Sequence, residues 1–169
     1  MRVDETEVQR RLERFKAVAR DAGLKLTHQR LEIFKAIASS LEHPSAEFVH
    51  QTVQATMPTV SLDTVYRTLW LLTDLGLATT LGPRQDSVRF DANVENHHHF
   101  ICTRCGLVRD FESNDLNALQ IPDTVHHFGR IESTHLEVRG VCDQCTKERP
   151  RSRPPTANKS PRDSNRSKS

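Results

Sequence analysis

The stretch SLDTVYRTLWLLTDLG, residues 61–76, has the pattern of an amphipathic helix. Its apolar residues recur at intervals of three and four, so they fall on one face. The residues that form this face are Leu62, Val65, Leu69 and Leu72. Ser61 is a favourable N-cap, and Gly76 suits the left-handed position that follows a helix. We therefore predict a helix here that packs its apolar face inward.

The polar face of this helix is a candidate DNA-reading surface. Thr64, Arg67 and Thr68 fall on it, with Tyr66 at its margin. A helix laid in the major groove presents such side chains, because arginine there contacts guanine or phosphate. The same pattern also fits an ordinary amphipathic helix with a solvated polar face, and the pattern alone leaves both interpretations open.

Three further helices are expected before this one, and two short strands after it. The expected helices run from Glu5 to Ala22, from a Thr27 cap onward, and from a Ser45 cap to Met57. The strands are LATTLG and SVRFDA, on either side of a turn that contains Gly-Pro. Helices followed by a two-stranded wing make a winged helix, and the fourth helix would be its DNA reader. We assign residues 1–90 to this DNA-binding domain.

Beyond residue 95 the pattern changes to a small α/β unit. HHFIC and LVRDF are expected strands, SNDLNALQIPDTVHHF is an expected helix interrupted near Pro122, and IESTHLEVRGVC is an expected long strand. We assign residues 97–147 to this second domain and residues 91–96 to a hinge. The predicted fold class is therefore α+β, a winged helix followed by a small α/β domain.

The end of the chain differs in composition from the rest. Residues 148–169 have almost no apolar side chains, so we expect a disordered basic tail. From Thr146 onward the chain carries eight of its 24 basic residues but two of its 22 acidic ones, which leaves the rest with a net charge of −4. DNA binding by the body therefore needs a local patch. No apolar run could cross a membrane and the N-terminus is no secretory signal, so we expect a cytoplasmic protein with reduced thiols.

The four cysteines form two Cys-x-x-Cys pairs. They are Cys102, Cys105, Cys142 and Cys145. Each pair is expected at a strand end followed by a turn, where it presents two thiolates to one ion. Two such pairs complete the four-sulfur tetrahedron that zinc prefers, and reduced thiols in the cytosol are more often metal ligands than disulfides. We predict a structural zinc site.

The stretch NHHHFICTRCG, residues 96–106, adds three histidines directly before the first pair. Along a strand, His97 and His99 point one way, and His98 and Cys102 point the other way. The first two histidines therefore suit a second metal ion on the opposite face. Further donors are Asp91 at the hinge, Asp110 on the neighbouring strand, and His43 before the third helix. Such a set suits Fe(II), Mn(II) or Zn(II) rather than calcium or magnesium. We expect surface or capping roles for Asn96, His98, His126 and His127.

Several motifs together resemble the ferric uptake regulator family. They are GLKLTHQRLEIF, HPSAEFVHQTV, VSLDTVYRTLWLL, VRFDA, HHHFICTRCG and LEVRGVCDQC, which cover the chain from about Arg14 to Cys145. The resemblance implies a homodimeric repressor that binds a double-stranded DNA operator and dimerises through the α/β domain. It implies a structural Zn(II) on the four cysteines and a regulatory Fe(II) or Mn(II) at five residues. Those five residues are His43, Asp91, His97, His99 and Asp110. We expect DNA contacts from Lys25, Ser61, Thr64, Tyr66 and Arg67.

Within this family, the ligand set resembles the peroxide-responsive branch, because iron-uptake members often carry Glu where this chain has Asp110. The resemblance implies His43 and His97 as the residues that peroxide oxidises. A third metal site usual in the family is expected to be absent, since Asn96, Asn117 and Thr134 stand where ligands are usual. His28 replaces a proline that is usual at the start of the second helix.

Two other functions compete with a peroxide-sensing repressor. An iron- or zinc-uptake repressor would use the same site to report metal availability. A non-haem iron oxygenase would use two histidines and one carboxylate, but five ligands leave little room for a substrate and no cosubstrate-binding cluster is evident. We therefore predict a regulator that is not an enzyme, with no small-molecule substrate and no membrane partner.

Overall fold

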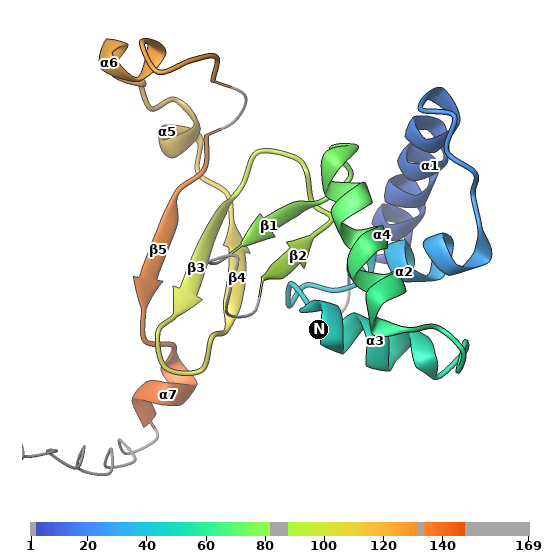
Figure 1. Ribbon diagram of the computed structural model, residues 1–169. Helices are drawn as coiled ribbons and strands as arrows, with labels where there is room; N and C mark the ends of the chain where they lie inside the picture. The colour runs from blue at the N-terminus through green and yellow to red at the C-terminus, as the bar shows by residue number, and fades with distance from the viewer. Residues whose placement is uncertain (1–2, 82–87, 132–133, 148–169) are drawn as a thin grey trace, which may run out of the picture.

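The computed structural model describes residues 3–81, 88–131 and 134–147 of the 169-residue chain. Its first half consists of four helices and a two-stranded sheet, and its second half of a three-stranded sheet with three short helices (Figure 1). In chain order the elements are α1 (Glu5–Asp21), α2 (His28–Ala38), α3 (Ala46–Gln54), α4 (Leu62–Asp74), β1 (Thr79–Leu81), β2 (Arg89–Asp91), β3 (His98–Cys102), β4 (Val108–Phe111), α5 (Asn114–Asn117), α6 (Asp123–His126), β5 (Glu137–Gly140) and α7 (Asp143–Lys147).

Local capping sets the helix boundaries. The hydroxyl oxygens of Thr27, Ser45 and Ser61 accept hydrogen bonds from the backbone N–H three residues later, at 3.3, 3.4 and 3.2 Å. Each satisfies a donor that the first turn of a helix leaves free. Gly76 follows α4 with a φ of 65°, as predicted. The third helix ends at Gln54, three residues earlier than expected, because the chain turns there and both Thr56 and Met57 donate to the carbonyl of Val53.

The helices enclose one apolar core, against which β2 packs. Val65, Leu69 and Leu72 of α4 are fully buried in it, and Leu62 is half-buried. Thr68 is also buried, although it was expected on the polar face of the helix. The reason is its spacing: Thr68 lies three residues after Val65 and four before Leu72, inside the packed stripe.

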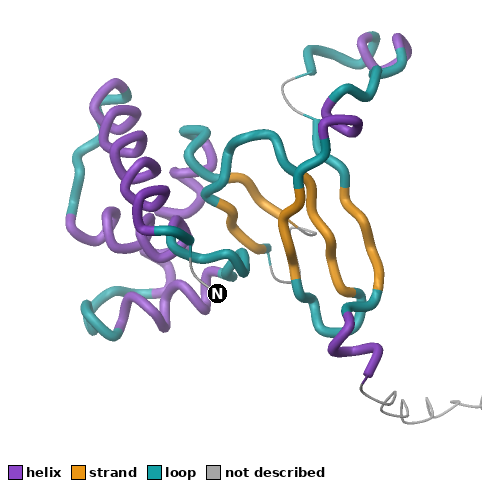
Figure 2. The backbone as a smooth tube through the Cα atoms, turned by 180° about the vertical axis from the view of Figure 1, so that it is seen from behind, coloured by secondary structure: helices purple, strands orange, loops and turns teal. Residues whose placement is uncertain are grey.

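The two sheets are separate and differ in topology. β1 and β2 form the antiparallel wing, with Leu81 opposite Arg89, whereas the second sheet has the order β4-β3-β5. In that sheet β3 is antiparallel to β4 and parallel to β5. The wing lies between the four helices and the larger sheet, and α5 and α6 lie beyond one end of that sheet with α7 beyond the other (Figures 1 and 2).

Two predicted elements of the second half are shorter than expected. The expected helix forms only as α5 and α6, because Pro122 has no N–H to donate and disfavours a helical conformation at Ile121. The expected long strand is reduced to the four residues of β5, which pair with β3 alone among the described strands. The Gly-Pro turn of the wing and the predicted tail at 148–169 lie outside the described residues, and the division into domains at 91–96 stays an interpretation.

Candidate metal centres

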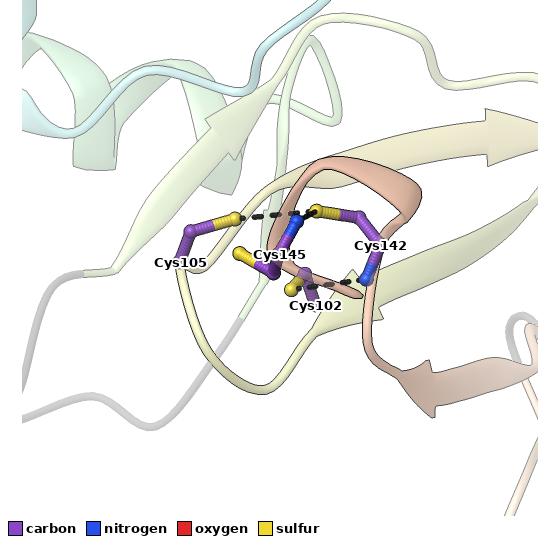
Figure 3. Close-up of side chains that lie close together, drawn as sticks. All are labelled: Cys102, Cys105, Cys142 and Cys145. Atoms are coloured by element: carbon purple, nitrogen blue, oxygen red, sulfur yellow. Dashed lines mark hydrogen bonds between the residues drawn. The ribbon is translucent and has the colours of Figure 1, made fainter. Parts of the chain in front are cut away.

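The four cysteines form one cluster of sulfur atoms. Cys102 is the last residue of β3, Cys105 lies in the turn that follows, Cys142 lies two residues after β5, and Cys145 belongs to α7. Their Sγ atoms all lie within 4.8 Å of one another and point toward a common centre (Figure 3). The first pair lies at a strand end followed by a turn, as expected. The second pair runs into a helix instead.

The parallel pairing of β3 with β5 brings the two cysteine pairs together. Cys102 lies opposite Gly140, so the turn after β3 and the residues after β5 leave the sheet at the same end. Backbone N–H groups of Cys105 and Cys142 lower the pKa of Cys102 to about 6, whereas the thiol of Cys105 raises the pKa of Cys145 to about 12. Four thiolates this close repel one another unless a cation lies between them, and the geometry fits zinc.

A second cluster contains the five other predicted ligands, which come from four segments of the chain. They are His43 between α2 and α3, Asp91 at the end of β2, His97 and His99 around the start of β3, and Asp110 in β4. One ligand atom from each lies within 4.8 Å of all the others. The first four are buried, and Asp110 is the most open to solvent. We call these five residues the His/Asp cluster.

The carboxylate oxygens of Asp91 and Asp110 lie close to the imidazole nitrogens of the cluster. Asp91 Oδ2 lies 2.8 Å from His97 Nε2, 3.3 Å from His43 Nε2 and 3.4 Å from His99 Nε2. Asp110 Oδ1 lies 2.9 Å from His43 Nε2. An ion with ligand bonds of about 2.1 Å separates adjacent ligand atoms by about 3 Å, so these spacings fit direct coordination.

The buried ring nitrogens of this cluster face one another and the two carboxylates. His43 Nε2 is buried, faces four other ligand atoms and lies 2.9 Å from Asp110 Oδ1 and 3.3 Å from Asp91 Oδ2. His97 Nδ1 lies 2.7 Å from the carbonyl of Glu95, which holds its proton there and directs the lone pair of Nε2 into the cluster. A bound cation would satisfy both nitrogens.

Without an ion, the carboxylates of the cluster favour the protonated form of its histidines. Burial alone would lower the pKa of His43, but Asp110 and Asp91 outweigh it and raise that pKa to about 9. Burial opposes ionisation of Asp91, yet hydrogen bonds from the three histidines bring its pKa well below the usual range. The pKa of His97 is raised as well, since Asp91 outweighs the effect of burial.

The other histidines and the third-site positions lie elsewhere. His98 points to the opposite face of β3, but it is buried rather than on the surface: its Nδ1 accepts a hydrogen bond from the N–H of Leu136 at 3.2 Å. Sequence periodicity could not show this, because the contacts come from other segments: the N–H of Leu136 and the ring of Phe111, whose centroid lies 5.4 Å from that of His98. His126 and His127 are exposed, as expected. Asn96, Asn117 and Thr134 meet around a cavity of about 290 Å³, whose other lining residues are apolar.

The predicted DNA face combines α4 with the start of α2. Arg67 is exposed and lies 3.6 Å from Asp63, and the hydroxyl of Tyr66 donates to Glu47 at 2.5 Å. Thr64 and Arg67 line an open groove of about 500 Å³. Its other lining residues are Thr27, Gln29, Arg30, Thr68 and Leu71.

Sequence reasoning missed two polar residues of this groove, Gln29 and Arg30. Their position in the first turn of a capped helix just ahead of the reader was the available signal. Arg30 donates to the carbonyl of Lys25 at 2.5 Å, so the backbone of the exposed Lys25 lies near a groove-lining residue. Ser61 serves as the cap of α4. Among the described residues, no helix has the length and apolar composition to span a bilayer.

Comparisons with known proteins all point to the same protein family. The model of the ferric uptake regulator family matches residues 21–139. The chain is 35% identical over 147 residues to the peroxide-responsive repressor PerR of Staphylococcus aureus, which covers 86% of this chain and 98% of that protein.

Solved structures support the same assignment. The ferric uptake regulator of Francisella tularensis with iron is 27% identical, with a TM-score of 0.61 over 74% of this chain and 96% of that chain. The Helicobacter pylori regulator Fur shares the fold, with a TM-score of 0.68 and 23% identity over 88% of this chain and 98% of the other. With this match over most of its length, and with both ligand clusters assembled, the chain belongs to the ferric uptake regulator family.

Proposed function

We propose that this protein is a metal-dependent transcriptional repressor that senses hydrogen peroxide through the His/Asp cluster. One observation carries the proposal: His43, from the helical half, meets Asp91 and Asp110 in a buried cluster with His97 and His99. An ion bound by all five residues would fasten the DNA-reading half to the sheet. A ligand shifts only an equilibrium between states that it distinguishes, and this one would favour the arrangement in which His43 reaches the sheet.

The two clusters suit different ions. Four thiolates in a closed tetrahedron suit a structural Zn(II), so we assign zinc to Cys102, Cys105, Cys142 and Cys145. Three imidazoles and two carboxylates suit Fe(II) or Mn(II), which we assign to the His/Asp cluster as the regulatory metal. Solved relatives include a ferric uptake regulator with iron and a zinc-bound manganese uptake regulator that is 30% identical, with a TM-score of 0.58 over 75% of this chain and 97% of that chain.

Peroxide sensing would act on the ligands themselves. Fe(II), when bound, supplies the electrons that cleave the O–O bond of peroxide, and Mn(II) does so far less readily. We propose that an imidazole carbon of His43 or His97 then takes up one oxygen atom of peroxide, while the second oxygen leaves as water. The altered ring is a weaker ligand, so the ion and the connection between the two halves are lost. The name of the Staphylococcus aureus relative, a peroxide-responsive repressor, supports this role.

We propose that the protein acts as a homodimer on a double-stranded DNA operator. β5 is an edge strand of its sheet, and Leu136, Val138 and Val141, on it or directly beside it, are exposed. Leu119 and Phe128 of the α5–α6 segment are exposed as well, Phe128 to 87%. An open edge flanked by apolar surface is a suitable place for a second copy of the chain. Regulation of transcription, rather than turnover of a small molecule, is the activity that such an assembly performs.

Peptide mass spectrometry tests the sensing step. Fe(II)-loaded protein treated with low peroxide should gain one oxygen on peptides that contain His43 or His97, and Mn(II)-loaded protein should not. Oxygen that appears first on the cysteines, or equally with both metals, would instead identify an iron- or zinc-uptake repressor.

Operator binding tests the reader helix. Arg67→Ala should weaken specific binding by about 1–3 kcal/mol if Arg67 makes a bidentate base contact. Arg20→Ala, which removes an equal charge from the exposed end of α1, is the matched control. Equal operator affinities for the two variants would remove α4 from the proposal.

A further inference from the structure

Arg89 lies between the loop that carries His43 and the turn that contains Gly106, and it belongs to neither ligand cluster. It opens β2 two residues before Asp91, so the two side chains leave the strand on the same face. Its Nη1 donates to two successive carbonyl oxygens, that of Glu42 at 3.3 Å and that of His43 at 3.2 Å. β2 therefore supplies one candidate ligand, Asp91, and through Arg89 it also binds the backbone of a second candidate ligand, His43.

His43 has an unusual backbone conformation. Its φ is 48°, in the left-handed region that residues with a Cβ rarely adopt, and within the described ranges it is the one non-glycine residue with a positive φ. The following residues are also fastened to β2. The N–H of Phe90 donates to the carbonyl of Pro44 at 3.0 Å, and Ser45 forms a bridge with Arg89. The surrounding contacts therefore have to maintain a conformation that His43 would leave on its own.

The guanidinium of Arg89 is confined on its other side by the first cysteine turn. Its Nη2 lies 3.5 Å from the point where a Cβ on Gly106 would stand. Gly106 directly follows Cys105 in that turn. Arg89 thus lies between the loop that carries His43 and the turn that carries Cys105. A side chain without donors would leave the two carbonyls without these hydrogen bonds.

We propose that Arg89 is a positioning residue for the regulatory metal: it fixes the backbone of His43 so that the imidazole stays directed at Asp91 and Asp110. The inference rests on the proposed metal binding of the His/Asp cluster. Residues that orient metal ligands from outside the coordination sphere typically change metal affinity 10–100-fold when replaced. Electrostatics alone predicts the opposite sign, because removing a cation near the cluster would strengthen binding of a divalent ion.

The test uses full-length, zinc-loaded protein and measures Mn(II) affinity by electron paramagnetic resonance. Arg89→Met keeps the apolar stem and removes the donors, and we expect it to bind Mn(II) about 10–100-fold more weakly than wild type. Arg89→Lys retains a donor and should recover part of the loss. Arg109→Met is the matched control: Arg109 adjoins Asp110 and donates to the carbonyl of Val108 at 2.9 Å, so this variant should bind Mn(II) as tightly as wild type or more tightly.

The outcomes separate this inference from the function on which it rests. If wild type binds Mn(II), His99→Ala does not, and Arg89→Met binds as well as wild type, the positioning role is overturned. Loss of zinc from Arg89→Met would also overturn it, since the residue would then support the cysteine turn. Failure of wild-type protein to bind Mn(II) would overturn the regulatory site itself. Weaker Mn(II) binding with full zinc content, improved by lysine, supports the proposal.

Discussion

The two ligand clusters use opposite strategies to bring their donors together. All four cysteines belong to the three-stranded sheet and the turns and helix at one of its ends. The His/Asp cluster takes His43 from the helical half, Asp91 from the wing, His99 and Asp110 from the larger sheet, and His97 from the residue before β3. The sulfur cluster can therefore form within one unit of the fold. The His/Asp cluster forms only while both halves are in contact.

This difference indicates that the sulfur cluster has a structural role and that the His/Asp cluster has a regulatory role. An ion on the sulfur atoms contributes directly to the folding of the sheet that carries them. An ion on the His/Asp cluster contributes instead to the contact between the two halves, which can be lost while each half stays folded. Four experiments test this difference between the two clusters.

The largest effect is expected from breaking the sulfur cluster. Cys102→Ser removes a fully buried ligand, so the protein should lose its zinc. Structural zinc contributes roughly 10 kcal/mol or more to the folding of small domains, so the sheet should unfold and the dimer should dissociate. Metal analysis and circular dichroism measure both effects. His126→Ala, on exposed α6, should change neither, and a zinc-free Cys102→Ser dimer with wild-type melting would contradict the structural assignment.

A smaller and more selective effect is expected from Asp91, which contacts all three histidines of the other cluster. Asp91→Ala should reduce Mn(II) affinity by at least about 100-fold, more than the loss of an orienting residue. Zinc content and secondary structure should stay unchanged, because Asp91 lies in the wing, whereas the four cysteines lie in and beside the larger sheet. Simultaneous loss of zinc would show that the two clusters form one cooperative site.

Protonation should have a measurable effect on the ion-free His/Asp cluster. The folded-state pKa of His43 is raised from 6.5 to about 9, so its stabilising effect is complete below pH 6.5 and is lost as the pH rises through 9. At 1.36 kcal/mol per pKa unit, the free energy of unfolding should fall by up to about 3 kcal/mol over this range. The lowered pKa of Asp91 acts the other way: its contribution is present above its usual pKa and is lost in acid.

Urea unfolding of zinc-loaded, Mn(II)-free protein at pH 6.5, 7.5 and 9 measures this loss, and His43→Ala should flatten the profile. Protons and metal compete for the same nitrogens, so Mn(II) affinity should rise over the same pH range. A wild-type profile as flat as that of His43→Ala would show that His43 carries no extra proton in the ion-free protein.

The smallest effect is expected from the strand pairing that supports the sulfur cluster. A Cβ on Gly140 would stand 2.9 Å from Cε2 of Phe100 on the neighbouring strand, and the end of that ring can move aside. Gly140→Ala should therefore cost about 1 kcal/mol of stability and weaken zinc binding slightly. Mn(II) affinity should be unaffected. Arg139→Ala, at an exposed neighbour on β5, is the control, and equal stability of the two variants would rule out the steric contact.

Local signals in the sequence predicted most of the helical half. The hydroxyl caps of Thr27, Ser45 and Ser61 act on neighbouring N–H groups, so short-range reasoning located the start of each helix. Alternation along β3 likewise separated His97 and His99 from His98 and Cys102. These predictions depend on bonds or faces that adjacent residues determine.

Features that depend on distant segments could not be predicted in this way. The burial of His98 follows from a hydrogen bond with Leu136, 38 residues further along the chain. Arg89 reaches the loop of His43 across 46 residues, and nothing in VRFDA indicates that contact. The family resemblance placed the five ligands, whereas the structure was needed to show which residues orient them.

The order of the ligands along the chain has a consequence for biosynthesis. Every donor of the His/Asp cluster precedes residue 112, whereas the second cysteine pair follows β5. At roughly 5–20 residues per second, a ribosome adds the intervening segment in a few seconds. During that time the nascent chain exposes its nitrogen and oxygen donors while only half of the sulfur donors exist. Zinc binds such donors more tightly than Mn(II) or Fe(II), so correct loading requires that the cell keep free zinc scarce or that early zinc transfer later to the thiolates.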